Sequence, residues 1–377
     1  KVLSIKESMS IARTDRATVI ANMLADLDEV INGNYLPASY DADNKGRITR
    51  WAAMAIKAKI YLFEGNWTQV KNITSTIMTE GGFRLFGSYA GLFEIANEYN
   101  SEVILDAQYR PTSREHQMMY AFLPPSLGGY SQLSPLQELV DSYIMLDGKT
   151  IRETGTSFDE SNPYANRDPR LKATVMYTGN SYTLADGTEV VINCEKGEGK
   201  DGYGVGSDCS ATGYYIKKYW DNTYRATLYS GLNPILIRYA DILLMNAEAL
   251  AELGELDKTA WDATIKPIRD RAGFTLASAV EFPEGASKDK LIEIVRNERR
   301  SELALEGHRH KDIIRWRIAD NVLNGWCHGL KTNDVVGTDD GYVRVENRTF
   351  NANRHYLWPI PQAERDLNGN LEQNPNW

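Results

Sequence analysis

Residues 291–317 read LIEIVRNERRSELALEGHRHKDIIRWR and combine the pattern of a buried helix with an unusual density of charge. Apolar residues recur at three- and four-residue spacings, which predicts a helical stripe facing the core. Glu298, Glu302 and Glu306 stand four residues apart and therefore project from one face of this helix. Gly307 predicts its end, and residues 311–316 predict a short second helix. Because an unpaired buried charge is very costly, we expect the acids and arginines of this charged segment, residues 291–317, to pair across a helix–helix contact.

Two other parts of the chain share one pattern, in which an alanine-containing helix ends at glycine and the next helix opens with tryptophan. The first copy turns at Gly65 before Trp67, and the second turns at Gly254 before Trp261. Small residues let paired helices approach closely, as in tetratricopeptide-like (TPR-like) repeats, and both tryptophans are expected in the core. Isolated repeats cannot bury their own faces, so we expect the pairs to pack against the charged segment.

The sequence between these helical pairs has a different character. Residues 83–233 are rich in Gly, Pro, Tyr and Ser, with short strands predicted at 102–108, 172–177 and 189–193 and a helix at 135–143. Outside this insertion, helices are predicted for residues 6–31, 49–64, 67–78, 235–253 and 261–272. We therefore predict a mainly α fold, a TPR-like helical-repeat scaffold with a large, irregular, loop-rich α+β insertion. The predicted parts are residues 1–82, 83–233 and 234–377, of which the first and third pack together as one compact unit.

Composition bounds the class of protein. Hydrophobic residues make up 42% and charged residues 25%, as in globular proteins, and the formal net charge of −9 argues against a nucleic-acid partner. No apolar run reaches the roughly eighteen residues of a membrane span. The chain contains 21 Tyr and 8 Trp against 9 Phe, a bias that favours wet surfaces offering flat rings with a polar edge.

The densest aromatic stretch lies near the end of the insertion and is the main candidate for ligand binding. Its first three tyrosines, Tyr214, Tyr215 and Tyr219, are assigned to a buried strand. The polar continuation and a second loop, LPPSLGGYSQ, carry rings and amides suited to sugars, because flat rings stack on sugar faces and amides bond hydroxyl groups. The predicted ligand-binding residues are Trp220, Tyr224, Tyr229, Tyr130 and Asn222.

Other chemistries have weaker support in the sequence. His308 and His310 lack the third-ligand spacing of a zinc enzyme. Asp201 and Asp208 could ligate Ca²⁺, but their spacing is not that of an EF-hand, so no metal or cofactor is predicted. The glutamates of the charged segment, paired with arginine, would stay ionised, which is the wrong state for the general acid of a glycoside hydrolase. No catalytic residue is predicted.

The cysteines leave two readings open. Cys194 and Cys209 bracket the loop EKGEGKDGYGVGSD, which a disulfide would close if the protein is exported. The alternative is two free thiols.

Several long, ungapped stretches resemble the SusD/RagB family of surface nutrient-binding lipoproteins. NERRSELALEGHRHKDIIRW, residues 297–316, resembles the family signature "ER..EL..EG.R..DL.RW". YLWPIPQAERDLNGNLEQNPNW, residues 356–377, resembles the closing "PIP..E...NP.L.QNPGY". Further resemblance lies in residues 133–149, 162–179, 213–219 and 238–250, so that it touches most of the chain.

This resemblance implies a non-catalytic lipoprotein on the cell surface of the outer membrane. Such a protein captures oligosaccharides and delivers them to a SusC-type TonB-dependent transporter during polysaccharide utilisation. Signal peptide, lipid-modified cysteine and further helical sequence precede the matched part in this family, so the membrane anchor is expected outside this chain.

Three alternatives remain open: a RagB-like lipoprotein that imports peptides, a glycoside hydrolase, and a structural adaptor without a ligand. A peptide groove would offer strand edges and charged ends, whereas a glycan groove would offer flat aromatic arcs.

Overall fold

The computed structural model describes residues 2–223 and 228–377. The chain is mainly helical, and its strands form small, separate sheets. The N-terminal helices are α1 (Ile5–Ser8), α2 (Arg16–Asn32), the 3₁₀ helix η1 (Ala42–Asn44), α3 (Arg50–Glu64) and α4 (Trp67–Glu80). The C-terminal part comprises β6 (Ile235–Arg238), α8 (Tyr239–Leu253), α9 (Lys258–Ala272), α10 (Ala277–Val280), α11 (Lys288–Glu302), α12 (Arg309–Arg315), α13 (Ala319–Val322), β7 (Gly325–Lys331), β8 (Thr338–Asp339), β9 (Tyr342–Arg348) and α14 (Gln362–Leu367).

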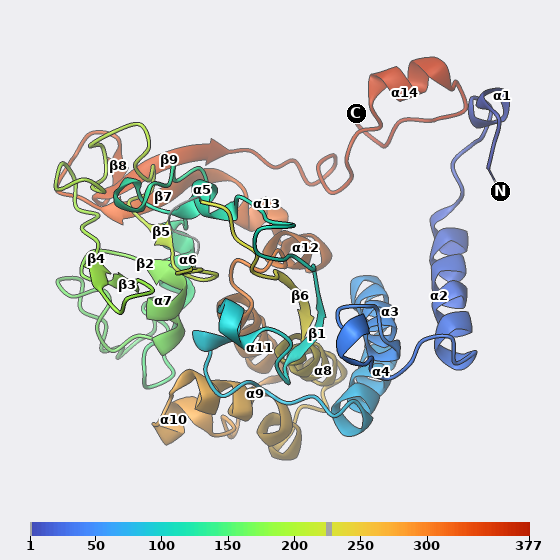
Figure 1. Ribbon diagram of the computed structural model, residues 1–377, viewed down its shortest axis with the longest axis horizontal. Coiled ribbons are helices and arrows are strands. Elements are labelled where there is room, and N and C mark those ends of the chain that lie inside the picture. The colour runs from blue at the N-terminus through green and yellow to red at the C-terminus, as the bar shows by residue number, and fades with distance from the viewer. Residues whose placement is uncertain (1, 224–227) are drawn as a thin grey trace.

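The two predicted helical pairs form and stack on each other. α3 packs on α4 and α8 on α9, while α4 lies against α8, although the insertion separates them in sequence (Figure 1). Gly65 and Gly254 end α3 and α8 in the left-handed conformation, with φ of 69° and 74°. Trp261 is fully buried, and Trp67 packs at the edge of the core between the pairs. The prediction of an interrupted TPR-like scaffold is therefore confirmed.

α11 packs against α8 and α9, as expected for the charged segment, but it ends earlier than predicted. The helix stops at Glu302, and Leu305 then adopts a positive φ of 63°. This turn carries Glu306 back toward the same buried space that Glu298 and Glu302 face. The three glutamates therefore face one space, as predicted from their spacing, although they do not lie on one continuous helix.

The insertion contains short elements joined by long loops. These are η2 (Gly91–Phe93), η3 (Ile95–Asn97), β1 (Val103–Asp106), α5 (Met118–Phe122), η4 (Pro125–Leu127), α6 (Gln137–Ser142), α7 (Pro169–Thr174), β2 (Val175–Met176), β3 (Ser181–Thr183), β4 (Glu189–Val191) and β5 (Tyr215–Ile216). Its own apolar core includes Tyr143, Tyr182 and Tyr215. β1 of the insertion pairs with β6, directly before α8, which joins the insertion to the scaffold.

Three predicted elements were wrong in detail, and one sheet was not predicted. Residues 235–238 form β6 instead of the start of a helix, because the run Ile-Leu-Ile is paired with β1. Residues 172–177 are split between α7 and β2, since Asp168 caps a helix there and its carboxylate accepts from the Arg170 amide. The helix of residues 6–31 is interrupted, because Asp15 caps a new helix, α2. The sheet β7–β9–β8 was not predicted.

The two ends of the chain meet in an arm beside the main body. Figure 1 shows α14 next to α1, and Asn368 Nδ2 donates to the Ile11 carbonyl oxygen at 2.9 Å. α2 has no fully buried residue. Within the part of the chain that the structure describes, no helix has both the length and the apolarity needed to cross a bilayer.

Candidate functional site

A buried network of ion pairs joins the insertion to the scaffold. Glu302 on α11 lies at its centre and contacts three arginines from other elements. Its Oε1 accepts from Arg238 Nη1 at 2.6 Å and from Arg271, and its Oε2 accepts from Arg170 Nη1 at 2.9 Å. The expected pairing of the charged segment is confirmed, but the cations come from distant parts of the chain.

Lys218 ties the aromatic stretch to this network. Its buried Nζ donates to Glu306 Oε1 at 2.7 Å and to the Ala304 carbonyl oxygen at 2.9 Å, and it lies 4.2 Å from the centroid of the Phe93 ring. Burial lowers the pKa of Lys218 to about 8, and the neighbouring Glu306 carboxylate opposes that fall. The segment that follows Lys218 is thus anchored two residues before Trp220.

The glutamates of the network are held ionised. Burial alone would raise the pKa of Glu302, but Arg271, Arg238 and Arg170 outweigh it and hold that pKa well below its ordinary value. The pKa values of Glu298 and Glu306 are lowered in the same way against the effect of burial. A carboxyl group in this state cannot donate a proton near neutral pH, so none of these three glutamates can act as a general acid.

The loop after Trp220 is organised by the buried carboxylate of Asp221. Asp221 Oδ1 accepts from the Thr223 amide at 2.9 Å and its Oδ2 accepts from Ser230 Oγ at 2.6 Å. Ser230 also exchanges two backbone hydrogen bonds with His116, both of 2.9 Å. Asp221 therefore fixes the chain on either side of residues 224–227.

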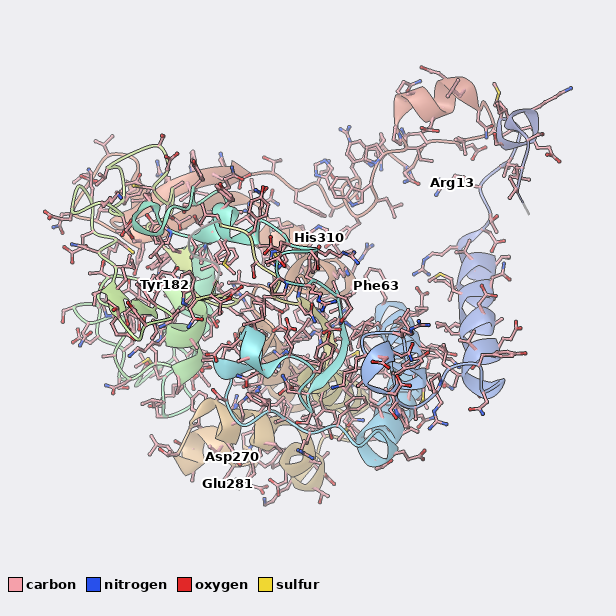
Figure 2. The ribbon with its side chains drawn as sticks, viewed as in Figure 1. Arg13, Phe63, Tyr182, Asp270, Glu281 and His310 are labelled. Atoms are coloured by element: carbon pink, nitrogen blue, oxygen red, sulfur yellow. The ribbon has the colours of Figure 1, made fainter. Side chains whose placement is uncertain are left out.

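Trp220 is half-buried at the outer end of the insertion core. Its ring centroid lies 5.1 Å from that of Tyr182, a residue of β3 that Figure 2 labels, and its Nε1 donates to the Thr183 carbonyl oxygen at 2.8 Å. Much of the ring is thus used in packing.

Tyr130 lies in a more open setting. It is 47% exposed, and its ring stacks on Tyr120 with centroids 5.5 Å apart. A Cβ on Gly128 would lie 3.6 Å from Leu228, so the Tyr130 loop adjoins the chain that leads to Tyr229. Tyr229 is 42% exposed. The structure thus brings these two loops side by side.

The other residues of the aromatic stretch differ in how far they are exposed. Asn222 is half-exposed next to Asp221, and Tyr224 lies outside the described residues. Tyr214, Tyr215 and Tyr219 are buried in the insertion core, as predicted. Sequence reasoning missed Tyr120, although its place ten residues before Tyr130 in an aromatic-rich stretch was a usable signal, and it missed the organising role of Asp221.

The other sequence candidates occupy ordinary structural positions. Asp201 is buried, and its Oδ1 accepts from the Ser126 amide at 2.7 Å. Burial lowers the pKa of His308 to about 4. Cys194 and Cys209 are free thiols. Over the described residues, no group of three or more His, Cys, Asp or Glu side chains is arranged to hold a metal ion.

Comparison with known proteins gives one consistent family. A solved SusD-like carbohydrate-binding protein from Bacteroides fragilis NCTC 9343 matches with a TM-score of 0.85 and 29% identity, over 98% of this chain and 74% of that one. A second SusD-like protein from that strain matches with a TM-score of 0.83 and 28% identity, over 100% and 74% of the two chains.

A curated SusD-like protein of Formosa agariphila is 27% identical over 346 residues, which cover 85% of this chain and 59% of that protein. The chain therefore spans less than two thirds of this relative. The model of the SusD family matches residues 92–377. Together with the solved relatives and the TPR-like scaffold, this match shows that the chain belongs to the SusD family.

Proposed function

We propose that this chain is a non-catalytic glycan-binding protein that captures oligosaccharides at the surface formed by Tyr120, Tyr130, Trp220, Asn222 and Tyr229. The observation that carries the proposal is the likeness, over 98% of the chain and with a TM-score of 0.85, to a solved SusD-like carbohydrate-binding protein. The exposed ring of Tyr130, stacked on the half-buried ring of Tyr120, supports it, because such rings offer flat apolar faces with polar edges.

The electrostatics of the charged segment support a binder over a hydrolase. Hydrolysis of a glycosidic bond needs a carboxyl group that stays protonated until it donates to the leaving oxygen. Glu298, Glu302 and Glu306 are held in the opposite state by arginine and lysine.

Delivery is the second part of the proposal. The captured oligosaccharide passes to a SusC-type TonB-dependent transporter of the outer membrane, and a lipid anchor ties the protein to the outer face of that membrane. Family membership supports this step. The stacked helical pairs α3–α4 and α8–α9 provide a rigid body that such a transporter can contact.

Native affinity electrophoresis tests the proposal. The full-length protein is run through gels that contain single polysaccharides, and retardation by at least one of them is expected. Retardation by none, together with binding of a peptide library, would transfer support to peptide import. Release of reducing sugar from a retarding polysaccharide would contradict the non-catalytic assignment.

A further inference from the structure

A separate cavity lies between α6, α11, α12, α13 and β7, whose positions Figure 1 shows. Its volume is about 520 Å³, which falls within the range of small-molecule sites. Of the described residues predicted to bind ligand, none lines it. Its lining contains aromatic, apolar and charged side chains. The charged groups determine which class of ligand the cavity can bind.

Most charged groups of the lining already have partners. Burial keeps His308 neutral by lowering its pKa to about 4. The ion pairs are Arg299 with Asp312 at 2.9 Å, Arg348 with Glu346 at 3.1 Å and Glu138 with the His328 ring at 2.8 Å. Two positively charged residues of the lining take no part in these ion pairs.

The two cations are Arg300 on α11 and Arg309 on α12. Across the described ranges, neither has a carboxylate within ion-pair distance: Arg300 donates Nη2 to the Glu138 carbonyl oxygen, and the Arg309 guanidinium lies 5.8 Å from the centroid of the Trp316 ring. Burial and the nearby charge of Arg309 together lower the pKa of Arg300 to about 10, and the Glu138 carboxylate opposes that fall. Two like charges in a half-buried space cost free energy that an anion between them would remove.

An aromatic ring completes the cavity. Trp326 of β7 lines it and is 43% exposed. Indole rings stack on apolar faces, and guanidinium groups bind carboxylate or sulfate through paired hydrogen bonds. Both features suit one ligand class, a sugar that carries an anionic group.

We propose that this cavity is a second saccharide site, selective for a sugar unit bearing a carboxylate or a sulfate. The anionic group lies between Arg300 and Arg309, and the sugar ring lies against Trp326. The proposal rests on the proposed glycan-binding function and adds a substrate class to it, since an acidic polysaccharide would engage this site as well as the aromatic surface.

Isothermal titration calorimetry on the full-length protein tests the site. The probes are a galacturonate trisaccharide, a sulfated galactose trisaccharide and an uncharged galactose trisaccharide. We expect at least one acidic probe to bind tenfold or more tightly than the neutral one, and the probe that binds identifies carboxylate or sulfate as the recognised group. Arg309→Gln and Trp326→Ala should each weaken that binding at least tenfold. Arg317→Gln, which removes an exposed arginine stacked 4.0 Å from the Tyr356 ring centroid, is the matched control and should leave it unchanged.

Three results would overturn the proposal. The first is equal affinity of the acidic and neutral probes, and the second is no binding of either acidic probe. The third is unchanged affinity in Arg309→Gln, with a melting temperature equal to that of wild type. Retardation of the protein by a neutral polysaccharide in any of these cases would keep the proposed function while removing this site.

Discussion

Glu302 makes ion pairs that hold the insertion, residues 83–233, against the C-terminal part of the chain, residues 234–377. Its carboxylate contacts Arg170 from the insertion, and Arg238 and Arg271 from the C-terminal part. A buried ion network gives little net stability against an apolar alternative, but breaking it leaves uncompensated charges. The network instead specifies which surfaces pack against each other.

Glu302→Gln should therefore lower the free energy of unfolding by about 3–5 kcal/mol, because three guanidinium groups lose their shared anion. Chemical denaturation followed by circular dichroism measures this change. Lys258→Ala, which removes an exposed pair with Asp262 at 2.6 Å, is the control and should leave stability unchanged within error. Equal effects of the two substitutions would contradict the central role of Glu302.

His328 should make stability depend on pH. Burial alone would lower its pKa, but hydrogen bonds to Asp339 and Glu138 outweigh burial and raise the pKa above its ordinary value. The stabilisation from its positive charge is thus fully present below about pH 6.5 and is lost as the pH rises through the native pKa.

The comparison of wild type with His328→Gln by chemical denaturation at about pH 5.5 and pH 8.5 checks this. The difference in the free energy of unfolding should be larger at the lower pH. A difference that is the same at both pH values would show that His328 is not held charged by Glu138 and Asp339.

At the scale of elements, glycines set where helices end and where strands approach. Gly254 ends α8 with a φ of 74°, and a Cβ there would meet no atom within 4 Å. Gly213 has a φ of 73°, and its Cβ would lie 1.6 Å from Leu330 Cδ2. The two glycines have nearly the same φ, and they differ in the room available for a Cβ atom.

Gly254→Ala should consequently cost about 1 kcal/mol, the price of the left-handed conformation alone. Gly213→Ala should cost a further 1–3 kcal/mol or so, because the added methyl group displaces β7. Thermal or chemical denaturation of both variants measures the two values. Equal costs would mean that Leu330 moves aside without penalty.

Elements with local sequence signals were predicted correctly, whereas features that depend on residues far away in the chain were not. α3, α4, α8 and α9 follow from periodicity with Gly65 and Gly254 as stops, all of which are local signals. β6 was misassigned because its partner, β1, lies far away in the chain. The pairing of Glu302 was expected, but its partners Arg170 and Arg238 could not be chosen from spacing, since only the fold brings them together.

The candidate site likewise combines features that the local sequence predicts with features that depend on the fold. The exposed rings of Tyr130 and Tyr229 were predicted from composition and polar context. The stacking of Tyr120 on Tyr130 depends on how the loop folds back. The cavity lined by Arg300, Arg309 and Trp326 is assembled from separate elements, and no motif marks it.

For the molecule as a whole, the scaffold and the loops that we propose to bind ligand are coupled through one network. Lys218 links Glu306 of the charged segment to the stretch that carries Trp220, and β1 pairs with β6 at the start of α8. The loops are thereby fixed to the packed helices of the scaffold, which would limit the ordering cost of the proposed oligosaccharide binding.

The most direct test of glycan capture at this surface is calorimetric titration of the Tyr130→Ala, Tyr229→Ala double variant with an oligosaccharide from a retarding polysaccharide. Trp358→Ala, which removes a 79% exposed ring on the C-terminal arm, serves as the control. Stacking of a nucleic-acid base on an aromatic side chain is worth roughly 1–3 kcal/mol. If each tyrosine contributes at the low end of that range, the double variant should lose at least tenfold in affinity while the control binds like wild type. Wild-type affinity in the double variant, with its melting temperature preserved, would contradict the assignment of this surface.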